Sequence, residues 1–261
     1  MNFSLKGKNA LVCGSSKGIG KAIAIALAKQ GANVTLAARN EKSLISTMSE
    51  LDTSDGQQHD LLIADFSKPQ ELKELIRNRL KTIAFQVLVN NTGGPSPGNI
   101  MDATEEQFLS AFNNHLLCNH ILAIALIPGM KENKYGRIIN VISTSVKIPL
   151  KGLGVSNTVR AAVANWSKTL SNELAPFGIT VNNILPGTTN TDRIREIILN
   201  RAAAEGKTYE EYEKEMVREI PMGRFGEPSE IAAAAVFLAS PAASYVTGIN
   251  VPVDGGRTGS L

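Results

Sequence analysis

One stretch decides the fold of this chain: Val12-Cys13-Gly14-Ser15-Ser16-Lys17-Gly18-Ile19-Gly20. It joins a short apolar run, Asn9–Cys13, to a segment of helical period, Gly18–Gln30. Glycines let a backbone turn tightly and approach a phosphate, and the first turn of a helix offers unpaired N–H groups. An ordinary turn could carry the same glycines. The strand before it and the helix after it favour a dinucleotide site.

The same alternation of short apolar runs with helical segments continues to the end of the chain. We expect seven strands, at Asn9–Cys13, Asn33–Ala38, Leu61–Asp65, Gln86–Asn90, Arg137–Ile142, Ile179–Leu185 and Asn250–Val253. Alternation of this kind is typical of a parallel sheet with helices on both faces. The predicted fold class is α/β: a single-domain, Rossmann-type, doubly wound seven-stranded parallel sheet over residues 1–261.

Three further helical segments matter for the site: Glu41–Asp52, Glu105–Met130 and Ser156–Ala175. In the last of these, apolar residues spaced three or four apart form one face that should pack on the sheet. Ser156 and Arg160 share a different face, because they are four residues apart. A charged helical segment at about 188–221 is too long for a simple crossover, and we expect it to be a substrate lid.

Composition excludes several classes of partner. The net charge is only +3 and the charges are spread along the chain, which argues against nucleic acid. Cys13 and Cys118 stand in apolar runs without metal-ligand spacing, so we expect two free buried thiols and no metal site. We find no secretory signal and no run of about 18 uncharged apolar residues. The expected protein binds no membrane and is cytoplasmic.

Charge also predicts which nicotinamide cofactor is preferred. NAD-selective sites usually place an acidic residue after the second strand, where it binds the ribose hydroxyls. This chain has Arg39 there, and Lys17 stands in the glycine turn. Guanidinium and ammonium groups bind phosphate well, so the pair suits the 2′-phosphate of NADP(H). The alternative is that both are solvated surface charges.

Further motifs follow the glycine turn in a recognisable order: Asn90-Asn91-Thr92-Gly93, Ser143, Pro186-Gly187 and Val253-Asp254-Gly255-Gly256. With these motifs, essentially the whole chain resembles the short-chain dehydrogenase/reductase family. Two stretches, Ile220–Ile231 and Tyr245–Gly248, look like those of bacterial 3-oxoacyl-(acyl-carrier-protein) reductases.

The resemblance assigns roles in the cofactor site. It implies that Asp65 contacts the adenine, that Asn90 and Gly93 line the cleft, and that Pro186-Gly187 flank the nicotinamide. Asp65 is alternatively a polar residue that ends a strand. The full predicted cofactor set is Gly14, Ser15, Ser16, Lys17, Gly18, Ile19, Gly20, Arg39, Asp65, Phe66, Asn90, Asn91, Gly93, Arg160, Pro186 and Gly187.

The resemblance breaks at the catalytic centre. Family members use a serine, a tyrosine, a lysine and a supporting asparagine; the matching positions here are Ser143, Ser156, Arg160 and His115. Adjacent Asn113-Asn114 leave the register of the last position open. Three of the four positions are altered, which resembles a divergent subgroup that lacks the Tyr-x-x-x-Lys pair.

The substitutions differ in what they preserve. An aliphatic hydroxyl is far less acidic than tyrosine, so Ser156 is a poor direct proton donor. Arg160 remains cationic and can still bind ribose hydroxyls, but it is not expected to shuttle protons. His115 is either a proton source near neutral pH or a satisfied core histidine.

These observations lead to two functional expectations. The first is an NADPH-dependent reductase of a small-molecule or acyl-carrier-bound carbonyl, such as a 3-oxoacyl thioester, with an atypical catalytic centre. The second is a non-catalytic NADP-binding protein that has lost reductase chemistry. Altered chemistry on an unrelated substrate remains a third reading, since a fold does not fix a reaction. The resemblance also implies a homodimer or homotetramer formed through the two long helices.

Overall fold

A computed structural model describes residues 1–260 of the chain, so Leu261, the end of the predicted domain, lies outside the described residues. The strands are β1 (Asn9–Cys13), β2 (Asn33–Ala38), β3 (Asp60–Ile63), β4 (Val87–Asn90), β5 (Gly136–Val141), β6 (Ile179–Pro186) and β7 (Asn250–Val253). They form one parallel sheet in the order β3-β2-β1-β4-β5-β6-β7. The predicted fold class is confirmed.

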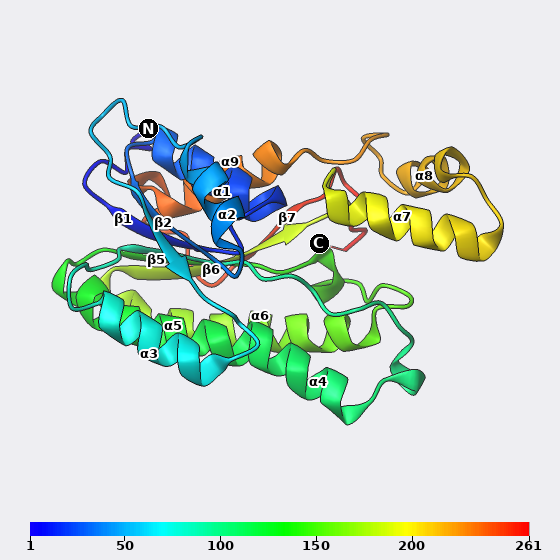
Figure 1. Cartoon of the computed structure of the whole chain (residues 1–261), viewed down its shortest axis with the longest axis horizontal. Helices are drawn as coiled ribbons and strands as arrows, with labels where there is room; N and C mark the ends of the chain where they lie inside the picture. The colour runs from blue at the N-terminus through cyan, green and yellow to red at the C-terminus, as the bar shows by residue number, and fades with distance from the viewer. Residues whose placement is uncertain (261) are drawn as a thin grey trace.

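Nine α-helices accompany the sheet in the described residues: α1 (Gly18–Lys29), α2 (Glu41–Met48), α3 (Pro69–Arg79), α4 (Glu105–Phe112), α5 (Cys118–Glu132), α6 (Gly154–Leu174), α7 (Asp192–Glu205), α8 (Tyr209–Arg218) and α9 (Pro228–Ala239). Helices α1, α2 and α9 cover one face of the sheet, and α3, α5 and α6 cover the other (Figure 1). Helices α7 and α8 project beyond the carboxyl ends of the strands (Figure 1).

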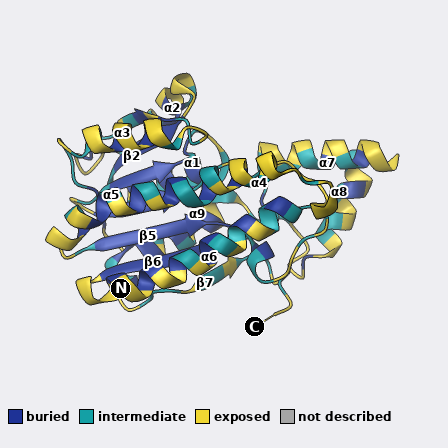
Figure 2. Ribbon diagram, turned by 90° about the horizontal axis from the view of Figure 1, so that it is seen from below, coloured by how far each residue is buried: buried dark blue, intermediate teal, exposed yellow. Residues whose placement is uncertain are grey.

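The two faces of the sheet follow from the alternation of side chains along each strand. In β1, Ala10 and Val12 pack under α1 and α9, whereas Leu11 and Cys13 pack on the α3–α5–α6 side. Every residue from Ala10 to Cys13 is therefore buried, as expected for a central strand of a parallel sheet. Figure 2 shows the buried strands between helices that expose their outer faces.

Several predicted elements differ at their ends, and one differs inside. β3 ends at Ile63, because Asp65 accepts hydrogen bonds from the N–H and hydroxyl of Ser67 and closes a turn. Helix α2 ends at Met48, four residues before the predicted end. The long helix predicted over 105–130 is split, because a π-helical turn at Asn113–Leu117 separates α4 from α5.

By length and mean hydropathy, the helical run Glu105–Glu132 meets the criteria of a membrane span, which the sequence expectation did not anticipate. Part of the run is nevertheless core: 44% of its most apolar window is buried inside the molecule. Cys118, Leu122 and Met130 pack on the sheet side. We interpret the run as a core helix of this fold. Cys13 and Cys118 are free and buried, as predicted.

Candidate active site

The site lies at the carboxyl ends of β1, β4, β5 and β6, where the loops that follow these strands meet. Gly14 occupies the left-handed region at φ +60, and a Cβ there would stand 2.2 Å from the Asn91 carbonyl oxygen. A Cβ on Gly20 would stand 2.2 Å from the Gly14 carbonyl oxygen. Only glycine fits both positions. Asn91 Nδ2 completes the turn by donating to the carbonyls of Cys13 and Gly14 at 3.3 Å each.

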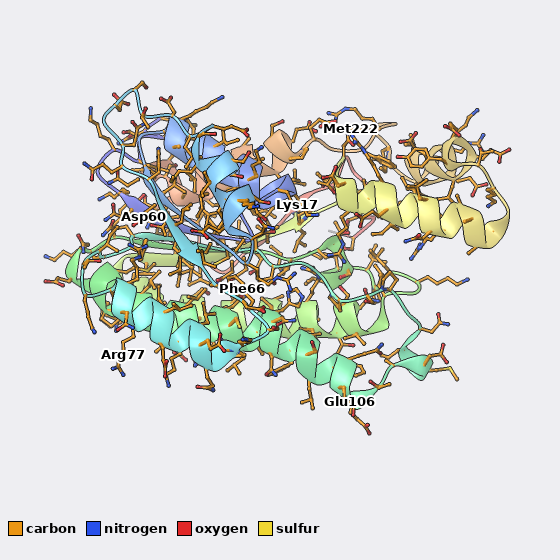
Figure 3. The ribbon with its side chains drawn as sticks, in the orientation of Figure 1. Lys17, Asp60, Phe66, Arg77, Glu106 and Met222 are labelled. Carbon is orange, nitrogen blue, oxygen red and sulfur yellow. The ribbon has the colours of Figure 1, made fainter. Side chains whose placement is uncertain are left out.

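The first turn of α1 is free to bind an anion. Lys17, the residue at its N-cap, makes no side-chain capping hydrogen bond, and no acidic residue occupies the first turn. An ideal Cβ on Gly18 would stand 3.4 Å from Cγ2 of Thr191, the residue before α7. A hollow between α1 and α7 is lined by Gly18 and Lys21 of α1 and by Thr191 and Arg195. Figure 3 labels Lys17 next to the start of α1.

Two cations lie at the predicted adenine end of the cleft. Lys17 and Arg39 are exposed, and neither side chain forms a hydrogen bond or ion pair with another of residues 1–260. The pKa of Asp65 is held below its usual value, chiefly by the Ser67 N–H, with the charge of Arg39 contributing. Phe66 is half-buried against the α3–α5 core, and its carbonyl accepts a hydrogen bond from Cys118 Sγ at 3.2 Å. These residues fit a phosphorylated adenosine group.

Two predicted cofactor residues support the sheet instead. Ser15 is fully buried, and its Oγ accepts the Ala37 N–H at 3.0 Å, which ties the glycine turn to β2. Asn90 is 3% exposed and donates from Nδ2 to Asn140 Oδ1 at 2.8 Å. The Asn90 side chain is therefore enclosed within the sheet, so any contact of Asn90 with the cleft would come from its backbone.

Asn90 begins a ladder that crosses four strands in register. Asn140 Nδ2 donates to Asn183 Oδ1 at 2.9 Å and to Ser167 Oγ at 3.3 Å, and Asn183 Nδ2 donates to Asn250 Oδ1 at 2.8 Å. These asparagines are direct partners in the strand pairings β4–β5, β5–β6 and β6–β7. The ladder fixes the relative positions of the strand ends that carry the site.

The remaining predicted cofactor residues lie at the cleft. Ser16 and Ile19 are half-buried on the glycine turn, Gly93 is exposed after β4, and Pro186 and Gly187 end β6. Gly187 donates its N–H to the Val253 carbonyl at 3.0 Å, and a Cβ there would stand 2.7 Å from Asp254 Cα. The loop after β6 packs closely against the turn after β7, and this contact explains why position 187 is a glycine.

The structure brings the four predicted catalytic residues to the same end of the sheet. Ser143 follows β5, and its Oγ accepts the Ser145 N–H at 3.0 Å, while it donates its own proton to none of residues 1–260. Arg160 Nη1 donates to the Ile142 carbonyl at 2.8 Å, and Arg160 Nε donates to Ser156 Oγ at 3.1 Å. Arg160 thus joins the end of β5 to the first turns of α6.

His115 lies on the π-helical turn and contacts the loop after β4. Its Nδ1 lies 2.7 Å from Thr92 Oγ1, and the residue is 5% exposed. Burial lowers the pKa of His115 to about 3, and the charges of Arg160 and Arg193 act in the same direction. The imidazole is neutral near pH 7, which disfavours an imidazolium as the proton source. The alternative, a satisfied core histidine, agrees with its burial and hydrogen bond.

Sequence reasoning missed Arg193 and Gly94. Arg193 is exposed at the start of α7, yet its guanidinium reaches back to the loop after β4, where Nη2 donates to the Pro95 carbonyl at 3.3 Å. In the sequence, Arg193 was marked only by its position six residues after Gly187, within the charged segment that we predicted to be a lid. Because this contact spans about a hundred residues, periodicity could not reveal it.

Comparisons with known proteins agree with this geometry. The model of the family described as enoyl-(acyl carrier protein) reductase matches residues 14–258. The chain is 32% identical to the NADPH-dependent reductase BacG of Bacillus subtilis, covering 97% of this chain and 99% of that protein. It is 34% identical to the 3-oxoacyl-[acyl-carrier-protein] reductase FabG of Vibrio harveyi, covering 97% and 98%. L-sorbose reductase from Gluconobacter frateurii, solved with NADPH and L-sorbose, superposes with a TM-score of 0.93 at 32% identity, covering 100% of both chains.

Proposed function

Because this chain belongs to the short-chain dehydrogenase/reductase family, we propose that it is an NADPH-dependent reductase of a carbonyl substrate with an atypical catalytic centre. Relatives named as NADPH-dependent or solved with NADPH support the choice of cofactor. When bound, NADPH supplies the hydride. The free first turn of α1 would hold its diphosphate, and Lys17 and Arg39 would hold its 2′-phosphate.

One observation carries the proposal: the Ser143 hydroxyl is oriented by the Ser145 N–H and keeps its own proton. A hydroxyl that accepts one hydrogen bond can donate another to a carbonyl oxygen, which polarises the carbonyl for reduction. Arg160 adds a positive charge near the same strand end, where negative charge develops on that oxygen. The proton that completes the alcohol would come from solvent, because Ser156 is weakly acidic and His115 is neutral.

Two substrate classes fit the relatives. A 3-oxoacyl thioester is the substrate in the FabG-type names, and a sugar ketone is the ligand of the sorbose reductase. We propose the thioester as the first to test, because the stretches Ile220–Ile231 and Tyr245–Gly248 resemble those reductases. The lid is also a proposal: α7 and α8 would close over the cleft at about 188–221.

The test is NADPH oxidation with acetoacetyl-CoA, followed by the absorbance of NADPH. We expect turnover in the wild type and a loss of about 100-fold or more in Ser143→Ala, since a removed oxyanion donor costs on this order. Ser110→Ala, an exposed serine on α4, is the matched control. Tight NADPH binding with no turnover of acetoacetyl-CoA or of L-sorbose would instead favour a non-catalytic NADP-binding protein, the reading that Ser156 in the tyrosine position supports.

We also propose self-association in the cytoplasm. Leu109, Phe112 and Ile124 are 45% to 63% exposed on α4 and α5, and apolar side chains of this size favour burial against a second copy. The free thiols of Cys13 and Cys118 suit a reducing compartment. Light scattering of the wild type and of Leu109→Glu would show a dimer or tetramer that the substitution dissociates.

A further inference from the structure

Two arginines from distant parts of the chain converge on one glycine. An ideal Cβ on Gly94 would stand 2.8 Å from Arg193 Nη2 and 2.9 Å from Arg160 Nη2. Arg160 comes from α6 and Arg193 from α7, whereas Gly94 lies in the loop after β4. Both guanidinium ends therefore lie beside the same point of the backbone.

Each guanidinium is anchored on one side and open on another. Arg160 uses Nε on Ser156 and Nη1 on the Ile142 carbonyl, and its Nη2 donates to no acceptor among residues 1–260. Arg193 uses Nη2 on the Pro95 carbonyl, and its Nη1 and Nε are free within the same range. The loop itself is held, because Gly98 exchanges backbone hydrogen bonds with Gly152 and Gly154 at 2.8 and 3.1 Å.

Among residues 1–260, no carboxylate lies within ion-pair distance of either arginine. Glu196, one turn along α7, acts on Arg193 only through space. Burial lowers the pKa of Arg160 to about 10, and the neighbouring Arg193 charge adds to this effect. Two neighbouring positive charges with free N–H donors form a site that a bound oxyanion would stabilise.

We propose that Arg160 and Arg193 bind a carboxylate of the substrate, so that the enzyme reduces a short oxo acid in its anionic form. This inference rests on the proposed reductase function. A carboxylate is flat and small enough to accept hydrogen bonds from both guanidinium groups, and Ser143 at the end of β5 would meet the adjacent carbonyl.

The alternative source of an oxyanion is a phosphate of the cofactor. The first turn of α1, free for a diphosphate, lies in the helix layer on one face of the sheet, and Arg160 belongs to α6 on the other. Arg160 also hydrogen-bonds Ser156 and the residue before Ser143, which are positions of the reaction centre. This location favours the substrate, and the experiment separates the two sources.

The test compares acetoacetate and 2-oxobutanoate with their methyl esters, in which a methyl group removes the negative charge. We expect the oxo acids to be reduced by the wild type, and Arg193→Met to raise their KM by about 10-fold or more while changing the KM of the esters by less than about 2-fold. Arg77→Met, which removes an exposed arginine from α3, should leave both unchanged. Equal effects of Arg193→Met on acids and esters would overturn the proposal.

A second variant tests the geometry without removing charge. Gly94→Ala introduces a Cβ within 2.9 Å of both guanidinium ends and should raise the KM of the oxo acids. Gly98→Ala, in the same loop with nothing within 4 Å of its Cβ, is the matched control. An unchanged KM in Gly94→Ala would show that the two guanidinium groups do not converge at Gly94.

Binding without turnover separates this inference from the proposed function. Calorimetric titration of the NADP⁺-loaded protein with each oxo acid measures the anion site when no hydride is available. Weaker binding in Arg193→Met supports the site even if no ketone is ever reduced. Failure of both oxo acids to bind the wild type overturns it, whatever the activity on thioesters or sugars. Loss of NADP⁺ affinity in Arg193→Met, with oxo acid affinity unchanged at saturating cofactor, assigns the arginine to the cofactor and also overturns it.

Discussion

Arg160 Nε donates to Ser156 Oγ at 3.1 Å across one turn of α6. We predict that these two residues occupy the positions at which family members carry the lysine and the tyrosine. In this chain the serine is an acceptor that orients a guanidinium. A hydroxyl that positions a cation contributes through geometry, whereas a tyrosine in its place would contribute through acidity.

Ser156→Ala should therefore weaken the enzyme only modestly. Losing one hydrogen bond to a charged group costs about 1.5 to 3 kcal/mol, and we expect a matching fall in unfolding free energy with a loss of turnover below about 10-fold. Urea unfolding and steady-state kinetics measure the two effects. Ser156→Thr keeps the hydroxyl and is the control. A loss as large as that in Ser143→Ala would instead make Ser156 a proton donor.

Gly14→Ala should destabilise the protein and weaken NADPH binding. The residue has φ +60, and the new Cβ would stand 2.2 Å from a backbone oxygen. Gly56→Ala is the control, because φ is +81 there and nothing lies within 4 Å. We expect about 1 to 2 kcal/mol of backbone strain in both variants and a further loss only in Gly14→Ala. Equal thermal unfolding curves would refute the contact with Asn91.

Removal of Lys17 or Arg39 should change cofactor preference. Each substitution by alanine should weaken NADPH binding on the order of 10-fold and NADH binding by less than about 2-fold, because only NADPH carries the 2′-phosphate. Fluorescence titration of the two cofactors measures this. Lys29→Ala, at the other end of α1, is the control. Equal losses of affinity for both cofactors would show that neither residue binds the 2′-phosphate.

The stability of the protein should depend on pH through His115. The pKa of His115 is about 3 in the folded protein, below the ordinary 6.5, so the unfolded chain binds an extra proton between these values. The contribution of the neutral imidazole is therefore fully present above pH 6.5 and is lost as the pH falls toward 3, by at most about 1.4 kcal/mol per pH unit.

Urea unfolding at several pH values between 4 and 7 tests this. We expect the fall in stability to be smaller in His115→Asn than in the wild type, because the variant has no imidazole to protonate. His120→Asn, an exposed histidine of α5, should behave as the wild type does. Identical slopes in the wild type and His115→Asn would mean that the imidazole titrates alike in the folded and unfolded chains.

Asn140→Ala should be the most destabilising single change in the asparagine ladder. It would leave the Nδ2 of Asn90 and the Oδ1 of Asn183 without partners inside the sheet. Buried groups left in this way cost about 1 to 3 kcal/mol each. Asn78→Ala, on the exposed side of α3, is the control for urea unfolding. A change below about 1 kcal/mol would show that water replaces the lost partners.

The sequence by itself determined the architecture of this protein. The glycine turn after β1 and the alternation of apolar runs with helical segments predicted a parallel sheet of seven strands, because periodicity records which side of each element is buried. It also predicted the cofactor end of the cleft through Lys17 and Arg39. Element ends were less certain: β3 stops at Ile63 because the Asp65 side chain closes a turn.

Only the tertiary structure decided which residues meet at the predicted catalytic end. Arg160 and Arg193 meet at Gly94, and the asparagine ladder crosses four strands, through contacts between residues far apart in the chain. The neutral state of His115 depends on its burial and on the charges of those arginines, and neither can be read from its neighbours in sequence. Local pattern fixes which elements form, whereas hydrogen-bond partners and pKa values depend on how the elements pack.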